Sequence, residues 1–174
     1  PSPNQQLLQT NLKQLRLPTM LAEYAKLAQE AANANQDYVD YLLRLTELEL
    51  ATRASNALQA RIRQAGFPVQ KDLDSFDFTA ARGVSKPKVL ELARCDWIAT
   101  HQNCVLVGAS GTGKTHLAIA LGLSACRLGQ RVRFLTAASL VQKLEAAQKQ
   151  YALEPFLKRL DKVDLLICDE LGYL

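Results

Sequence analysis

The residues best suited to chemistry form one octapeptide, Gly108-Ala109-Ser110-Gly111-Thr112-Gly113-Lys114-Thr115. It fits the phosphate-binding pattern G-x-x-x-x-G-K-[ST]. The glycines let successive backbone N–H groups turn toward phosphate oxygens, and a following helix would direct its partial positive charge at the same anion. We expect Lys114 to reach the β- and γ-phosphates of ATP and the Thr115 hydroxyl to bind Mg²⁺. The alternative is an ordinary glycine-rich turn ahead of a helix.

A second candidate is the segment 163–170, an apolar run that ends in the carboxylates Asp169 and Glu170. Such a run is typical of a buried parallel strand with acids at its carboxyl end, where open α/β sheets bind ligands. Asp169 is expected to hold Mg²⁺, directly or through water. Glu170 is the candidate general base for the attacking water. The alternative is a solvated acidic turn after a core strand.

The elements needed to position these groups can be found along the same stretch. Residues 104–107 predict a strand, 115–128 a helix, 132–135 a strand, 138–150 and 156–160 helices, and 163–168 the final strand. A further helix is predicted over 88–99. Alternating strands and helices with a phosphate loop at the first turn predict an α/β fold with a doubly wound parallel sheet. This nucleotide-binding domain would cover residues 86–174.

The region before it, 1–66, has helical periodicity throughout. Pro18 should end a first helix, Thr19 should cap a second and Asp37 a third. On the third helix an apolar stripe is more consistent with core than with a binding site; it comprises Tyr38, Tyr41, Leu42, Leu45, Leu48, Leu58 and Ile62. Glu49 and Arg53 are expected to pair on its exposed side. Residues 67–85 form a linker anchored by Phe76-Asp77-Phe78, which could dock near a nucleotide base, although simple packing is favoured.

Composition excludes some functions and permits others. The chain has 174 residues, 48% of them hydrophobic, and no apolar run or signal segment that suggests a membrane, so a cytoplasmic protein is expected. Four scattered cysteines favour reduced thiols over disulfides or zinc ligands. A net charge of +4 permits nucleic-acid binding. Candidate DNA contacts are Arg53, Arg61 and Arg63, and a second basic group is Arg82, Lys86 and Lys88; solvated helix surface is the alternative for both.

Taken together, several motifs resemble the helper ATPases of IS21-type insertion sequences, the IstB family, and more distantly the DnaC-type helicase loaders. The resemblance covers essentially the whole chain. It is carried by the loop followed by Thr115-His116-Leu117-Ala118, by Cys168-Asp169-Glu170-Leu171-Gly172-Tyr173, by Phe76-Asp77-Phe78, and by Ala65-Gly66-Phe67-Pro68. The histidine after Gly-Lys-Thr and the string Asp-Glu-Leu-Gly-Tyr are the most specific features.

The resemblance implies an AAA+ ATPase fold, ATP with Mg²⁺, His116 within the nucleotide-binding motif and Glu170 as the hydrolytic base. It also implies ATP-dependent assembly of a homo-oligomer on duplex DNA, without sequence specificity, and delivery of that DNA to a partner transposase in the bacterial nucleoid. A helicase loader, or a non-catalytic interaction fragment, is the alternative function.

The resemblance also exposes a difference. AAA+ proteins continue past the second motif through a sensor strand and an arginine finger, and this chain stops at Leu174, so we expect a truncated product. In the family, the strand after the acidic motif lies between the strands of the two motifs. Without that strand the two cannot pair, so apolar edges should stay exposed unless a neighbouring subunit or altered packing covers the gap. Because no residue can be assigned as the arginine finger, we expect weak or absent ATP hydrolysis by this chain alone.

Overall fold

The computed structural model describes residues 2–81 and 83–173, so Arg82 of the second basic group lies outside it. The chain divides into two compact units, Pro1–Ala57 (unit 1) and Leu58–Leu174 (unit 2). This boundary falls inside the third helix, α3 (Tyr38–Ala65), rather than at its end near residue 66. The reason is that the last turns of α3 supply Ile62 and Ala65 to the core of unit 2. Within the described residues, no helix has the length and apolar character needed to cross a bilayer.

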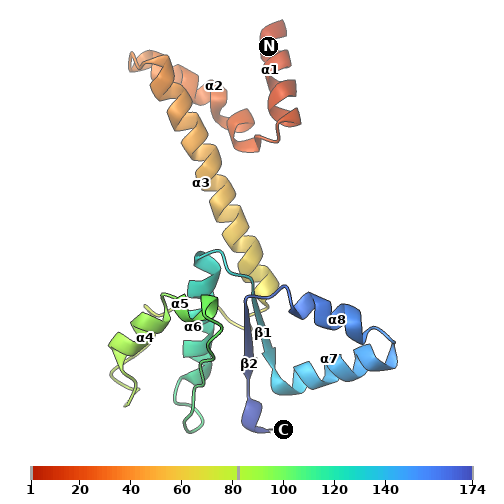
Figure 1. Ribbon diagram of the computed structural model, residues 1–174. Coiled ribbons are helices and arrows are strands. Elements are labelled where there is room, and N and C mark those ends of the chain that lie inside the picture. Colours follow the sequence, from red (N-terminus) through yellow and green to blue (C-terminus); the bar gives the residue numbers. More distant parts are fainter. Residues whose placement is uncertain (1, 82, 174) are drawn as a thin grey trace. The chain divides into compact units, whose positions relative to one another are not determined.

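Unit 1 consists of α1 (Pro3–Gln14), α2 (Pro18–Asn33) and the first part of α3 (Figure 1). Ser2 and Gln5 form a capping box that begins α1, because each side chain bonds the other's backbone N–H. Pro18 occupies the first turn of α2, where a missing N–H costs nothing. The predicted cap of α2 was wrong by two residues: Leu17 is the N-cap, and Thr19 lies inside the helix.

Glu49 of α3 supplies the cap that α2 lacks. Its Oε2 accepts hydrogen bonds from the backbone N–H groups of Thr19 (2.8 Å) and Met20 (3.0 Å), and its Oε1 accepts one from Arg53 Nε (2.9 Å). The expected pair with Arg53 therefore exists, but not on an exposed side, because Glu49 is only 3% exposed. Burial raises the pKa of Glu49, and the hydrogen bonds from Met20, Arg53 and Thr19 outweigh it, so the pKa lies below its ordinary value.

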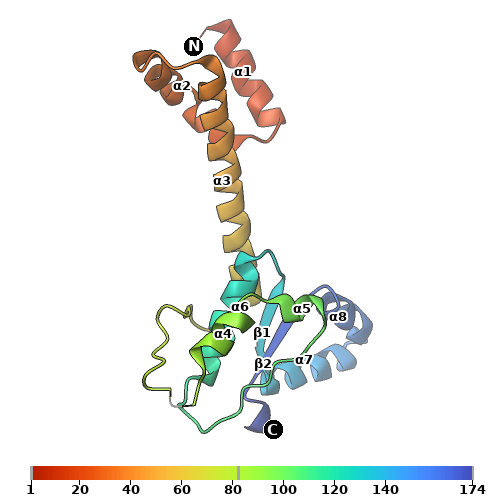
Figure 2. The same cartoon turned by 60° about the vertical axis from the view of Figure 1, so that its left-hand side comes forward.

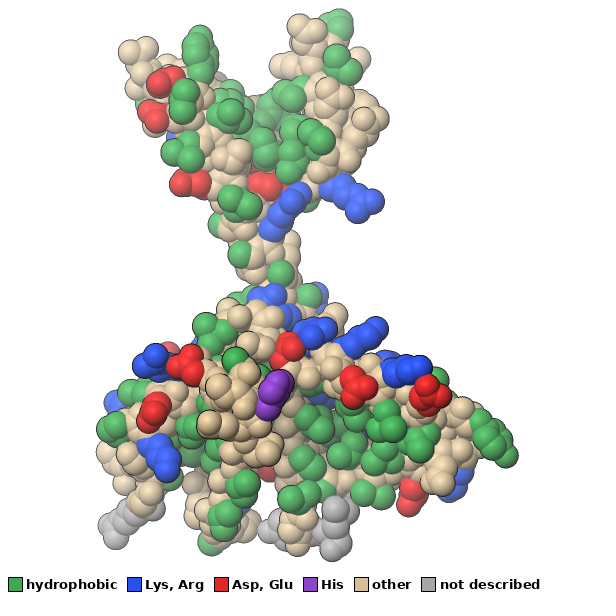
Figure 3. All heavy atoms as spheres, in the orientation of Figure 1, with side chains coloured by type: hydrophobic (Ala, Val, Ile, Leu, Met, Phe, Trp, Pro, Cys, Tyr) green, Lys and Arg blue, Asp and Glu red, His purple; other side chains and the backbone are tan. Residues whose placement is uncertain are grey.

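The apolar stripe of α3 is mostly not core in unit 1, which corrects the prediction. Leu45 is buried, whereas Tyr38 is 90% exposed and Leu42 is 52% exposed. Figure 3 shows apolar side chains of unit 1 open to solvent on the face in view. Two short helices in a 57-residue unit bury only part of an apolar face.

Unit 2 is built on a parallel pair of strands, β1 (Val132–Thr136) and β2 (Leu165–Asp169). The helix after the phosphate loop, α6 (Lys114–Arg127), packs on both strands. On the opposite side of the strands lie α7 (Ala137–Lys149) and α8 (Leu153–Leu160), which connect β1 to β2 (Figures 1 and 2). After β2 the chain makes a 3₁₀ turn, Leu171–Tyr173. The α/β arrangement is thus present, with two strands in the described part of the sheet.

The strand predicted over 104–107 is absent: these residues form no strand, and Val105 and Val107 are 77% and 89% exposed. A strand exists only through hydrogen bonds to a neighbour, and within the described residues β1 and β2 pair with each other. An apolar, β-branched sequence therefore did not suffice to make a strand here.

The helix predicted over 88–99 is two helices, α4 (Lys86–Leu92) and α5 (Asp96–Ala99). Cys95 interrupts them with a left-handed backbone, φ 61°, and its buried side chain joins the core. The core of unit 2 lies between α6, the end of α3 and the strands. There Gly122 of α6 allows a close approach, because a Cβ at this position would lie 2.7 Å from Ile167 of β2. This contact sets how α6 sits on β2.

Candidate nucleotide-binding site

The two sequence motifs meet at the carboxyl end of β2. Thr115, in the first turn of α6, donates a hydrogen bond from Oγ1 to Oδ2 of Asp169, the last residue of β2, at 2.8 Å. The hydroxyl and carboxylate expected to hold Mg²⁺ are therefore adjacent, although 54 positions separate them in the chain. The packing of α6 on β2 brings them together.

The phosphate loop places a helix amino terminus at the same point. Gly113 is the N-cap of α6 with φ 87°, and Gly111 has φ 75°, both in the left-handed region that favours glycine. Among the described residues, no side chain caps α6. Its first N–H groups have no partner one turn back in the helix, so they are available to an anion.

Lys114 is folded back onto its own loop. Its Nζ donates to the carbonyl oxygen of Ala109 at 2.6 Å, and the hydroxyl of Thr112 donates to the same oxygen at 2.8 Å. The Ala109 carbonyl thus holds the ammonium group beside the loop. To reach a bound phosphate, the lysine exchanges this neutral acceptor for a charged one.

The linker packs directly beneath the loop. Phe76 is 8% exposed and forms a cluster with Leu117 of α6 and Val89 of α4. Its ring lies so close to Gly113 that a Cβ there would be 2.8 Å from Cε2. Asp77 closes the linker turn, and the hydrogen bond from the Thr79 hydroxyl, followed by those from the backbone N–H groups of Ala80 and Thr79, holds its pKa below its ordinary value. The Phe-Asp-Phe segment is therefore an anchor of the loop as well as of the linker.

His116, expected within the nucleotide-binding motif, faces this linker. Its Nε2 lies 2.9 Å from the carbonyl oxygen of Asp72 and 3.4 Å from the Ser75 hydroxyl. Its ring also meets Phe76 edge-on, with centroids 5.1 Å apart. Here the histidine ties the first turn of α6 to residues 72–76.

Glu170, the candidate base, follows β2 with a left-handed backbone, φ 59°, and an exposed side chain. A non-glycine residue in this conformation costs of order 1–3 kcal/mol and is often found at functional sites.

The three arginines proposed for DNA contact are divided between the two units. Arg53 belongs to unit 1, where it bonds Glu49 and the carbonyl of Arg16. Arg61 belongs to unit 2, where its Nε donates to the carbonyl oxygen of Cys126 near the end of α6, at 2.9 Å. Arg63 is exposed. Arg53 and Arg61 thus have intrachain bonds that stabilise their own units.

Sequence reasoning missed two parts of this site. Thr136 lies opposite Asp169 in the strand register, and its hydroxyl accepts the backbone N–H of Ser139 to begin α7. A threonine directly after the strand predicted at 132–135 was the available signal. The packing of Phe76 against Gly113 had none, because local sequence does not reveal such a contact.

The loop, the uncapped helix and the acid at the carboxyl end of the strand define a P-loop nucleotide-binding protein. The family model "IstB-like ATP binding protein" matches residues 10–174, and the chain belongs to this family. This confirms the resemblance drawn from the motifs.

Three relatives carry similar descriptions. An ATP-binding protein ascribed to an insertion sequence of Sinorhizobium fredii is 40% identical over 94% of this chain. One ascribed to insertion sequence IS5376 of Geobacillus stearothermophilus is 36% identical over 92%, and one ascribed to IS21 of Pseudomonas aeruginosa is 35% identical over 96%. The matched regions span 55%, 64% and 63% of those relatives, respectively.

Proposed function

We propose that this chain binds ATP with Mg²⁺ between the phosphate loop and the end of β2, and that it acts as a DNA-transposition helper. In that role it assembles on duplex DNA as an ATP-dependent oligomer and presents the DNA to a transposase. The observation that carries the nucleotide part is the contact between Thr115 and Asp169 at the amino terminus of α6. The descriptions of the relatives, which all refer to insertion sequences, support the transposition part.

The donor set suits a magnesium ion. A hydroxyl and a carboxylate are hard oxygen ligands, and Mg²⁺ is commonly held by one or two protein oxygens together with phosphates and water. The oxygens of Thr115 and Asp169 are 2.8 Å apart. Adjacent ligands of an octahedral ion with bonds of 2.0–2.1 Å are separated by roughly 2.9 Å. A bound ion would neutralise charge on the β- and γ-phosphates.

The protein groups divide the remaining work. The N–H groups of the loop and of α6 bind and orient the phosphate oxygens, and Lys114 supplies a positive charge beside them. Glu170 is the candidate acceptor for a proton from water, because Asp169 is already committed to Thr115. Phe76 and His116 fix the loop and α6 to the linker.

The test is equilibrium binding of a fluorescent ATP analogue, with and without Mg²⁺. Lys114→Ala should weaken binding at least tenfold, because it removes a charge-assisted contact worth roughly 1.5–3 kcal/mol. Lys149→Ala, which removes the same charge near the end of α7, should not change binding. Asp169→Asn should abolish the gain in affinity that Mg²⁺ provides and leave the metal-free affinity intact. Equal affinities for the wild type and Lys114→Ala would exclude this site.

DNA assembly and transposase presentation need their own measurement. Sizing of the protein with duplex DNA should show a large complex with a non-hydrolysable ATP analogue and none without nucleotide. Lys114→Ala should form none in either condition. A complex that ignores nucleotide would contradict an ATP-controlled assembly.

A further inference from the structure

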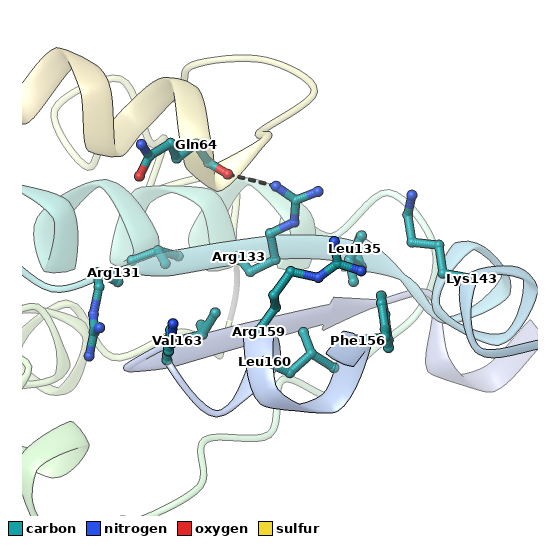
Figure 4. Close-up of a pocket in the computed structure, with 11 residues that line it drawn as sticks. Gln64, Arg131, Arg133, Leu135, Lys143, Phe156, Arg159, Leu160 and Val163 are labelled. Atoms are coloured by element: carbon teal, nitrogen blue, oxygen red, sulfur yellow. Dashed lines mark hydrogen bonds between the residues drawn. The ribbon is translucent and has the colours of Figure 1, made fainter. Parts of the chain in front are cut away.

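Unit 2 has a hollow of about 450 Å³, and none of the phosphate-loop residues lines it. It is lined by β1, by α7 and α8, by the turn that leads to β2, and by Gln64 near the end of α3 (Figure 4). Its apolar lining includes Leu135, Phe156 and Leu160. Five cationic side chains also line it: Arg131, Arg133, Lys143, Arg159 and Lys162.

The charges around the hollow do not cancel. Arg131 is matched by Asp164, which accepts from its Nη2 at 3.0 Å and its Nε at 3.1 Å. Across the described part of the chain, no ion pair joins a carboxylate to Arg133, Lys143, Arg159 or Lys162. The nearby acid Glu154 is taken by Lys158 at 2.7 Å. Four positive charges therefore remain without a counterion from the protein.

Two of these cations are held in place by neutral contacts. Arg133 Nη1 donates to the carbonyl oxygen of Gln64 at 2.8 Å, and the other N–H groups of Arg133 take no part in this bond. The Arg159 guanidinium lies 5.9 Å from the centre of the Phe156 ring, within cation–π range. In the view of Figure 4, the Arg159 side chain lies between those of Arg133 and Lys143. Part of the entropy of ordering these two arginines is thus lost before any ligand binds.

We propose that this hollow binds the phosphate backbone of duplex DNA through Arg133, Lys143, Arg159 and Lys162. The inference rests on the proposed function, in which the chain assembles on duplex DNA, and it assigns a surface for that contact. The four cations come from β1, from α7, from α8 and from the turn that leads to β2, and all four line the hollow. Several spaced cations suit a row of phosphates.

The expected loss follows from counterion release. Each phosphate contact with duplex DNA contributes about 0.9 to the slope of log K against log salt concentration. If one contact contributes nothing at 1 M salt, it therefore raises the affinity about eightfold at 0.1 M salt. Lys143→Gln with Arg159→Gln should weaken binding by roughly 60-fold at 0.1 M salt and reduce the slope by about 1.8. Both side chains are exposed, so the fold should be kept.

The matched control is Lys149→Gln with Lys158→Gln. Lys149 and Lys158 lie on α7 and α8, as Lys143 and Arg159 do, but they do not line the hollow. Their substitution removes the same charge. Binding of a labelled 30-base-pair duplex is measured by anisotropy between 50 and 200 mM salt, with ATP analogue and Mg²⁺, and thermal melting checks each variant. The control should stay within about threefold of the wild type, because Lys149 and Lys158 do not line the hollow and would make no phosphate contact in it.

The outcomes separate the two proposals. If the wild type does not bind duplex DNA, the DNA part of the proposed function fails. If it does bind, and the hollow variant matches the control in affinity and slope, the proposed function stands and this inference is wrong. Poly-glutamate serves as a second probe. If the hollow variant loses poly-glutamate binding but binds DNA as the wild type does, the hollow belongs to an acidic protein segment and the inference is overturned.

Discussion

Gly113 offers a test of how the phosphate loop is held, because two different constraints coincide at this residue. Its φ of 87° is unfavourable for any residue with a Cβ, and that Cβ would lie 2.8 Å from Cε2 and 3.3 Å from Cζ of Phe76. Gly111 provides the matched control. It has a similar φ of 75°, but a Cβ there would meet nothing within 4 Å. The two Gly→Ala substitutions therefore differ chiefly in the contact with Phe76.

The backbone term is common to both variants. A left-handed backbone costs an alanine roughly 1–2 kcal/mol, and the restricted unfolded chain returns about 0.4–1 kcal/mol of this. Gly111→Ala should thus destabilise unit 2 by roughly 0–1.6 kcal/mol. Gly113→Ala adds overpacking against Phe76, which costs typically 1–3 kcal/mol in a packed site. The expected difference between the two variants is therefore about 1–3 kcal/mol.

The assay is urea unfolding followed by the fluorescence of Trp97, whose indole N–H bonds the Leu92 carbonyl within unit 2. Phe76→Leu, which removes the ring, completes a double-mutant cycle. In that background Gly113→Ala should cost no more than Gly111→Ala does. Equal destabilisation by the two alanines in the wild-type background, or no coupling between positions 76 and 113, would refute the claim that the linker supports the loop.

Two further predictions concern carboxylates that join elements. Glu49→Gln should lower the stability of unit 1 by about 1–2 kcal/mol, as loss of a helix cap does. Because the pKa of Glu49 is depressed in the folded state, its contribution is full above the ordinary value of 4.5 and is lost as pH falls through the folded pKa. In an acid titration followed by circular dichroism, wild-type unit 1 should therefore unfold at a higher pH than a fit without Glu49 titration allows. Asp164→Asn should cost unit 2 about 1 kcal/mol in thermal melting, since the Arg131 side chain and backbone N–H both bond this carboxylate and lower its pKa. Here too the stabilisation is lost as pH falls, so the difference in stability between variant and wild type should vanish in acid.

Local sequence predicted the parts of the fold that depend on local interactions. The helix after the loop, the strand at 132–135 and the helices at 138–150 and 156–160 all lie within a few residues of α6, β1, α7 and α8. Their signals are helical periodicity, caps and a glycine stop, which act within a few residues. The proximity of Thr115 to Asp169 was also expected, because both residues were predicted to hold the same Mg²⁺ ion.

The errors arise where a partner decides the outcome. Residues 104–107 have strand composition, yet a strand needs a neighbour with matching hydrogen bonds. The burial of Glu49 depends on the amino terminus of α2, thirty positions away from it in the chain. None of these contacts has a local signal.

These observations explain what holds the nucleotide site together. The segment that enters the loop, 104–107, forms no strand, so the loop is not supported by sheet hydrogen bonds on that side. Its support comes from α6, which contacts β2 closely at Gly122, and from the linker, which contacts the loop through Phe76 and His116. Because Thr115 is on α6 and Asp169 is on β2, the distance between their oxygens depends on helix-to-strand packing rather than on strand pairing. The polar site is therefore positioned by apolar contacts at Gly113 and Gly122, where the fold has no space for an additional methyl group.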